Sequence, residues 1–343
     1  MAASAKSPVA RKRGLTARER DEAITGYLFL SPYLLVTAIF TVGIIAFALY
    51  ISFTSYNLFQ APQFNGLENY QKALTDTNGF IRSLVNIFWY VITVVPFQTA
   101  AALMLALILN RKIRGQQFFR TIFYGPSVTS SIVISAIFLW LYLKTGYVNF
   151  MFDRIFGLFG ADWSAIEWLN DPRGLFQLIA NAFGGDIPSN LWYLRGPSIT
   201  WMAIMFMNIF TTAPTFMIMY LAALQDVPPT LYEAASIDGA DGRQAFWNVT
   251  LPMLRPVTLL IVVLGTIGAF QVFDQVQFLT AGGPLNTTLT PVYLIYGEAL
   301  GRIGGGSIIR MGYASAMAFL LAIIIFIFTL IQRRYIESGT EQY

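Results

Sequence analysis

Six long apolar runs constrain this chain more than any other feature of its sequence. They are Tyr27–Phe53, Leu84–Leu109, Thr121–Leu143, Ile199–Leu224, Val257–Leu279 and Gly312–Ile331. None contains Lys or Arg. About 20 apolar residues in a helix cross the hydrocarbon layer of a bilayer. The composition agrees, because 56% of the residues are hydrophobic and only 12% are charged. The sequence therefore predicts an all-α fold, a polytopic membrane bundle of six transmembrane helices.

The positions of Lys and Arg predict the orientation of these helices. Basic residues gather in the N-terminal tail, after the second run, in the loop before the fifth run and after the last run. Loops rich in Lys and Arg stay on the cytoplasmic side of a membrane. We therefore expect a basic cytoplasmic tail at 1–26, six spans within 27–331, and a cytoplasmic tail at 332–343. Within the six-span region, 225–256 is a cytoplasmic loop and 145–198 is a long external connection.

Several kinds of chemistry are excluded by residues that the chain lacks. It has no Cys and no His, which excludes disulfides, thiol nucleophiles, imidazole bases and Cys/His metal sites. It also lacks the phosphate-binding pattern G-x-x-x-x-G-K-[ST]. We expect no catalytic residue, no metal and no cofactor in this chain. Its basic residues flank apolar runs, so nucleic acid is not an expected partner.

The cytoplasmic loop carries helix signals of its own. Thr230 and Glu233 have the spacing of a capping box, which predicts a short helix that begins there. Gly239 is placed to end that helix in a left-handed conformation. Asp241 and Gln244 form a second, weaker box, which predicts another short helix that ends before Pro252.

The apolar surface of this predicted helix pair is too large to be left exposed to water, so we expect lipid or another protein to cover it. Phe246 and Trp247 favour contact with lipid headgroups. The small Ala234 and Ala235 favour docking into a groove of another cytoplasmic protein. Shape alone leaves both alternatives open.

One motif in this loop resembles that of a known family. The residues Glu233-Ala234-Ala235, Gly239 and Val249-x-Leu251-Pro252 match the "EAA" pattern E-A-A-x3-G-x9-I-x-L-P, with Val in place of Ile. Three further segments are similar: "FNGLENY" (64–70), "LTAGGPLNTTLT" (279–290) and "GYASAMAFLLA" (312–322). Together they resemble a permease subunit of a binding-protein-dependent ABC importer, of the maltose-transporter (MalF-like) carbohydrate-uptake type.

The resemblance implies a set of partners and a role for the loop. The loop would couple to a dimer of cytoplasmic ATPase subunits, which bind ATP and Mg, through Glu233, Ala234, Ala235, Gly239, Leu251 and Pro252. A second homologous permease and an external solute-binding protein would complete the complex. The location would be a bacterial or archaeal plasma membrane, and the cargo a di- or oligosaccharide. Glycerol phosphate is the alternative cargo, because relatives of this type carry it.

Polar residues at helical spacing mark a candidate substrate path in three of the runs. The candidates are Ser127 and Ser131 in the third run, Asn208, Thr211, Thr212 and Thr215 in the fourth, and Gln271, Asp274 and Gln275 in the fifth. Polar groups inside hydrocarbon are costly unless they are paired or line a wet cavity. Helix–helix contact is the competing interpretation, and it is the commoner one for the serine row, which also includes Ser130 and Ser135.

The resemblance places the sugar site of maltose-type permeases in these same three runs. Matching positions here include Ala269 and Val272, which are small or apolar where a maltose site is polar and aromatic. The identity of the sugar therefore stays open. The path holds no Lys or Arg and does hold Asp274, which disfavours a phosphorylated cargo.

Two other classes of function compete with an ABC permease. A self-contained secondary transporter would need paired intramembrane charges for ion coupling, and Asp274 is the one plausible carboxylate. A membrane scaffold or sensor would not need the polar faces of the third to fifth runs.

Overall fold

The computed structural model describes residues 16–111, 114–301 and 309–337. The predicted basic tail up to residue 15 and the last six residues of the chain lie outside the described residues. The chain divides into an N-terminal unit, Met1–Ile51, and a main unit, Ser52–Tyr343.

The N-terminal unit is an apolar helix. It comprises α1 (Ala17–Thr37), a π-helical stretch η1 (Ala38–Gly43) and α2 (Ile44–Ser52), whose last residue already belongs to the main unit. From Arg20 to Ser52 the helix is 33 residues long, enough to cross a membrane. Its large apolar side chains are exposed; Leu28, for example, keeps 68% of its surface accessible. Such a surface suits contact with lipid and not with water. The first predicted span is confirmed.

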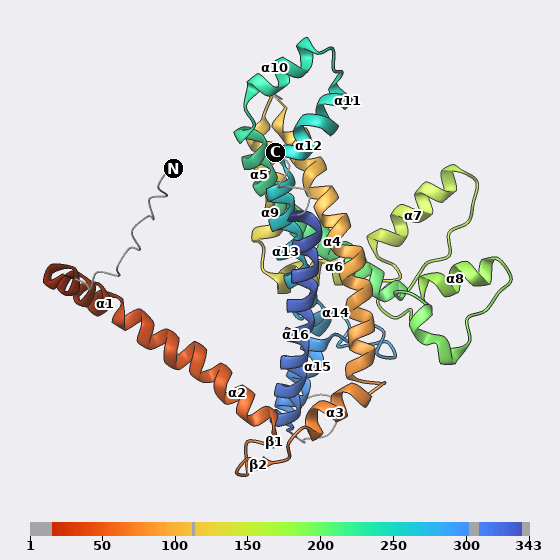
Figure 1. Cartoon of the computed structure of the whole chain (residues 1–343). Coiled ribbons are helices and arrows are strands. Elements are labelled where there is room, and N and C mark those ends of the chain that lie inside the picture. Colours follow the sequence, from red (N-terminus) through yellow and green to blue (C-terminus); the bar gives the residue numbers. More distant parts are fainter. Residues whose placement is uncertain (1–15, 112–113, 302–308, 338–343) are drawn as a thin grey trace, which may run out of the picture. The chain divides into compact units, whose positions relative to one another are not determined.

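Two long helices form the axis of the main unit. These are α4 (Phe80–Asn110) and α9 (Ile199–Asp226), which pack along each other, with α13 (Arg255–Phe270) and α16 (Met311–Glu337) beside them (Figure 1). One part of the core joins Tyr90 to Trp201, whose ring centroids are 4.7 Å apart, and Phe270. Another part is built on small residues such as Ala102, Ala106 and Ala213, which allow close helix contact in membranes.

Shorter elements lie at one end of this bundle and beside it. At one end lie the hairpin of β1 (Thr54–Ser55) and β2 (Gln63–Phe64), and α3 (Glu68–Thr75) (Figure 1). The predicted external connection forms α7 (Tyr147–Leu158), α8 (Leu175–Ala182) and the 3-10 turn η2 (Ser189–Leu194). After α13, the chain forms α14 (Asp274–Leu279) and α15 (Pro291–Leu300).

The third predicted span is not one straight helix. It divides into α5 (Gln116–Val128) and α6 (Ser131–Leu141), which meet at 96°. Thr129 and Ser130 are extended, with ψ of 141° and 137°. Pro126 lies three residues before this break and removes one backbone donor. The expectation that the serines share one helical face is therefore wrong.

The fifth predicted span is also interrupted. The helix α13 ends at Phe270, and α14 begins only at Asp274. The interruption leaves the carbonyl of Val272 without a helical partner, and the Thr290 hydroxyl donates to it at 3.1 Å. Gln271 and Asp274 therefore do not share a continuous helical face, contrary to the prediction.

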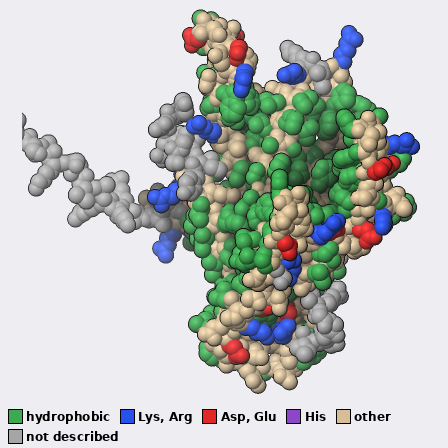
Figure 2. All heavy atoms as spheres, turned by 90° about the vertical axis from the view of Figure 1, so that its right-hand side faces the viewer, with side chains coloured by type: hydrophobic (Ala, Val, Ile, Leu, Met, Phe, Trp, Pro, Cys, Tyr) green, Lys and Arg blue, Asp and Glu red, His purple; other side chains and the backbone are tan. Residues whose placement is uncertain are grey.

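The surface of the main unit fits a membrane protein. The described residues contain five helices long and apolar enough to span a bilayer, or six if the bent pair α5–α6 is one span. In Figure 2, hydrophobic side chains cover broad areas of the face shown, and acidic side chains lie at its upper tip. The predicted all-α membrane bundle is confirmed.

Candidate substrate cavity and coupling loop

A polar cavity lies where the break in the third span meets α9 and α14. Its volume is about 190 Å³. Six predicted path residues line it: Ser127, Ser131, Thr211, Thr212, Thr215 and Gln275. Three others, Asn208, Gln271 and Asp274, do not line it. None of the described lining residues carries a charge, so the cavity suits a neutral, hydroxyl-rich molecule.

The break between α5 and α6 brings the two serines to the cavity from different helices. Ser127 donates to the carbonyl of Tyr124 at 2.8 Å, within α5. The hydroxyl oxygen of Ser131 is buried and has no hydrogen-bond partner among the described residues. Ser135, one turn further along α6, donates back to the carbonyl of Ser131 at 2.8 Å. The Ser131 hydroxyl is therefore available to a molecule in the cavity. The hydroxyls of Ser127 and Ser135 instead donate to backbone carbonyls of the preceding helical turn.

The threonines of α9 divide between packing and the cavity. The Thr212 hydroxyl lies 2.7 Å from Gln98 Oε1 on α4 and 2.8 Å from the carbonyl of Asn208. Thr211 also donates to the carbonyl of Asn208, at 3.0 Å. These contacts support a helix-contact role for Thr212. Thr215 lines the cavity one turn further along and is exposed.

Sequence reasoning missed Gln98, which is only 2% exposed. Its amide lies against α13 so closely that a Cβ atom on Gly265 would be 2.5 Å from Gln98 Nε2. A lone Gln within an apolar run was the available signal, because an intramembrane amide needs a partner. Pro126 and Thr129 also line the cavity. For the break between α5 and α6, the Gly125-Pro126 pair was the available signal in the sequence.

The interrupted fifth span moves two predicted path residues away from the cavity. Gln271 and Asp274 are exposed. Asp274 begins α14, where a carboxylate is favoured by the positive end of the helix dipole. Ala269 and Val272, which match sugar-site positions by resemblance, are buried in the bundle core.

The loop at 225–256, which is expected to couple to an ATPase and is called the coupling loop below, forms a compact helical hairpin at the far end of α9. Its first arm is α10 (Pro229–Ile237). The helix begins directly after Pro228, with a proline at its first position, so Thr230 lies inside the helix and cannot cap it. The predicted capping box of Thr230 and Glu233 is therefore wrong. Gly239 has a φ of +80°, which confirms the predicted left-handed turn.

The second arm is longer than the sequence suggested. The box of Asp241 and Gln244 is confirmed, with its two hydrogen bonds at 2.7 and 2.8 Å, and starts α11 (Gly242–Ala245). A π-helical turn η3 (Phe246–Thr250) and α12 (Leu251–Met253) follow without a gap, so helical structure continues through Pro252. The Leu251 N–H bonds to the carbonyl five residues back, and this wider turn accommodates the proline ring.

The hairpin carries its motif residues at one end of the main unit. The two arms are joined where the hydroxyls of Tyr232 and Thr250 lie 3.0 Å apart. Glu233 and Ala234 are exposed, while Leu251 and Pro252 are half-buried. Ile237 and Trp247 are 86% and 57% exposed. In Figure 1 this hairpin stands at one end of the bundle, at the end of α9, with no other element beyond it.

The fold and this hairpin match a known family. The family model described as "binding-protein-dependent transport system inner membrane component" matches residues 73–338. The chain belongs to this family. It is therefore a multi-pass membrane component of an ABC-type importer.

Curated relatives and a solved structure extend the match over almost the whole chain. A probable ABC transporter permease protein, YesP of Bacillus subtilis, is 33% identical over 91% of this chain and 90% of its own. The arabinooligosaccharides transport system permease protein AraP of Halalkalibacterium halodurans is 31% identical over 91% of this chain and 87% of its own. A bacterial alginate ABC transporter, crystallised with an alginate pentasaccharide-bound periplasmic protein, has a chain with a TM-score of 0.71 and 21% identity. That match covers 94% of this chain and 97% of the other. Its likeness shows the same fold.

Proposed function

We propose that this permease moves an uncharged di- or oligosaccharide into the cell, driven by ATP hydrolysis in a separate subunit. The observation that carries the proposal is the polar cavity between α5, α6, α9 and α14. Hydroxyl and amide groups both donate and accept hydrogen bonds, as a saccharide requires. The relative AraP, an arabinooligosaccharide permease, supports the same class of cargo.

The charge of the cavity disfavours a phosphorylated cargo such as glycerol phosphate. No Lys or Arg is among the described residues that line it. A dianion would lose its hydration there without gaining a fixed cationic partner.

A second homologous permease would complete the path. Thr129 and Thr215 line the cavity yet are exposed. Exposed polar side chains at membrane depth are costly in contact with lipid. An open polar edge of this kind is expected where a partner chain forms the other half of the cavity.

The hairpin of α10 to α12 would seat in a groove of a cytoplasmic ATPase subunit. Glu233, Ala234, Ala235, Gly239, Leu251 and Pro252 would form this contact, and the ATPase dimer would bind ATP and Mg. The exposed Ile237 and Trp247 favour docking into protein, because the hairpin that carries them has no other element beyond it (Figure 1). Both chain termini would then be cytoplasmic, and the solute-binding protein would dock at the opposite end.

Affinity purification from native membranes in mild detergent tests this assembly. We expect the chain to co-purify with a second permease and an ATPase, and the complex to hydrolyse ATP faster when the solute-binding protein is added. Recovery of the chain alone, active in ion-driven uptake, would contradict the proposal and support a secondary transporter.

A further inference from the structure

A second polar cavity lies at the end of the bundle opposite the coupling loop. It has a volume of about 240 Å³, and Arg82, Asn86, Gln177, Trp192, Arg195 and Thr287 are among its lining residues. Ser198, which also lines it, caps the start of α9, and α9 runs 28 residues from there to the loop. At 1.5 Å per residue, the helix separates the two sites by about 40 Å.

Two guanidinium groups of this cavity lack a countercharge. Neither Arg82 nor Arg195 forms an ion pair with any described residue, and both have a buried Nε atom without a hydrogen-bond partner there. The Arg82 guanidinium lies 5.1 Å from the centre of the Trp192 ring, and Arg195 donates to the carbonyl of Ile187 at 3.0 Å. Neither contact neutralises a charge. Two cations that face one cavity repel each other, and an anion bound between them would offset this repulsion.

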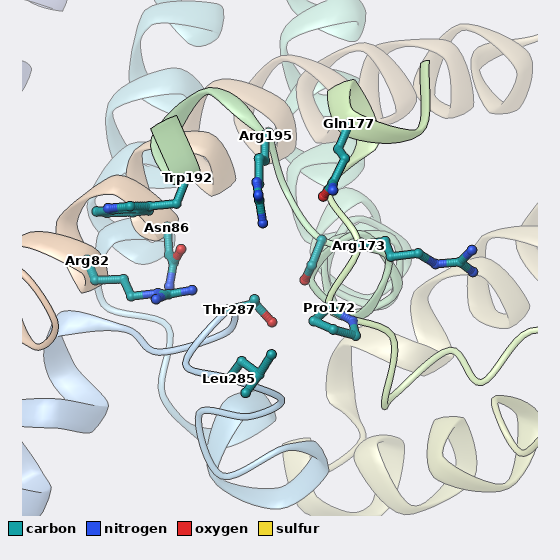
Figure 3. Close-up of a pocket in the computed structure, with 12 residues that line it drawn as sticks. Arg82, Asn86, Pro172, Arg173, Gln177, Trp192, Arg195, Leu285 and Thr287 are labelled. Carbon is teal, nitrogen blue, oxygen red and sulfur yellow. The ribbon is translucent and has the colours of Figure 1, made fainter. Parts of the chain in front are cut away.

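The third arginine of the cavity has a different role. Arg173 forms a bidentate pair with Asp171, in which Nε donates to Oδ1 and Nη2 donates to Oδ2. Burial raises the pKa of the Asp171 carboxyl, but the hydrogen bonds from Arg173 outweigh burial and lower this pKa below its usual value. Figure 3 shows the Arg173 guanidinium turned away from the centre, whereas Arg82, Arg195 and Gln177 extend into it. Arg173 therefore shapes the wall, and the other two arginines supply uncompensated positive charge.

We propose that this cavity receives an Asp or Glu side chain of the solute-binding protein when that protein docks. The inference rests on the proposed function, which makes this end of the bundle external. Planar guanidinium groups bind carboxylates with two parallel hydrogen bonds, and Gln177 and Asn86 add neutral polar groups. The family description itself requires a binding protein, and the alginate transporter was crystallised with one.

Two other sources of an anion fit the cavity less well. A phospholipid needs a groove for its acyl chains, but Pro172 and Leu285 are the only aliphatic side chains among the described lining residues. A carboxylated saccharide in transit would have to reach the cavity at α5, α6, α9 and α14, which shares no described lining residue with this one. A carboxylate of a docked protein needs neither a groove for acyl chains nor a connection to the other cavity.

The test measures ATP hydrolysis by the purified complex in vesicles against the concentration of the binding protein of the same transport system. For the double variant Arg82→Gln and Arg195→Gln, we expect the half-saturating concentration to rise about tenfold, because hydrogen bonds between charged groups are lost. The maximal rate at saturating binding protein stays unchanged. The single variant Arg195→Lys keeps the positive charge, so its half-saturating concentration should lie between those of the unaltered complex and the double variant. Arg154→Gln is the matched control, because Arg154 lies on α7 of the same connection, over the Phe150 ring, outside the cavity.

Salt and lipid composition identify the source of the anion. In the unaltered complex the half-saturating concentration should rise with NaCl, and this dependence should be weaker in the double variant. An unchanged half-saturating concentration in the double variant would overturn the inference. So would an effect seen only in vesicles with anionic phospholipid, or one confined to the uptake of a carboxylated saccharide. If the unaltered complex shows no stimulation at all, the proposed function itself fails, and this site fails with it.

Discussion

Single residues set how closely the helices of this permease approach. Gly265 on α13 leaves room for the amide of Gln98 on α4, and that amide holds the Thr212 hydroxyl of α9. Three helices therefore meet at one buried polar group. The apolar runs predicted that these helices pack together, but the partner of Gln98 could not be predicted, because it depends on three-dimensional register.

The first prediction concerns the contact at Gly265. Gly265→Ala places a methyl group against Gln98 and should destabilise the fold by about 1–3 kcal/mol, the usual cost of overpacking. The thermal unfolding midpoint in detergent measures this. Gly268→Ala is the matched control, because nothing lies within 4 Å of its added Cβ. The double variant Gly265→Ala and Gln98→Ala should recover part of the loss, and equal midpoints for the two glycine variants would refute the contact.

At the scale of elements, breaks in helices create the candidate site. The six spans could be predicted because apolar length is visible in the sequence. The break at Thr129–Ser130 could not be placed, because the serines on both sides of it keep a helical spacing in the sequence, and Gly125-Pro126 lies before it. The hairpin of α10 to α12 was predicted in outline from Gly239 and Asp241, but not the π-helical turn that continues it.

A second prediction tests the α5–α6 break. Ser131→Ala removes a hydroxyl that has no protein partner among the described residues and should raise the KM for sugar uptake about fivefold, since a hydrogen bond to the substrate is worth about 1 kcal/mol. Ser135→Ala is the control, because that hydroxyl bonds within its own helix. Initial rates of uptake by the reconstituted complex give both values. Equal KM values for the two variants would show that Ser131 does not face the sugar.

A third prediction tests the coupling hairpin. Gly239→Val forces a β-branched residue into a φ of +80°, which costs about 1–2 kcal/mol or more and should distort the turn between the arms. Transport should fall several-fold, and less ATPase should co-purify with the chain. Gly242→Val provides the comparison, because Gly242 has no positive φ and open space around it. If the Gly239 variant assembles and transports normally, the hairpin does not couple.

At the scale of the whole molecule, the proposal assigns one end of the bundle to each side of the membrane. The hairpin at 229–253 would face the cytoplasm, and the connection at 145–198 would face outward. The Lys and Arg pattern predicts this orientation, and the fold is consistent with it, because α9 joins the two ends.

A fourth prediction tests the orientation directly. The chain contains no Cys, so a single introduced thiol reports on one position alone. Ser164→Cys, on the exposed surface of the external connection, should react with a membrane-impermeant thiol reagent in intact cells. Ser236→Cys, exposed on α10, should react only after the membrane is permeabilised. Reaction of the second variant in intact cells would reverse the assignment.

Uptake of radiolabelled substrate decides whether this permease carries a neutral sugar or a phosphorylated cargo. The measurement uses vesicles that contain the complete complex, its solute-binding protein and internal ATP, with neutral oligosaccharides and glycerol phosphate as competing substrates. We predict ATP-dependent accumulation of a neutral di- or oligosaccharide, with little uptake of glycerol phosphate, because no described residue of the cavity provides a cation. Strong uptake of the phosphorylated substrate, with neutral sugars failing to compete, would contradict the account.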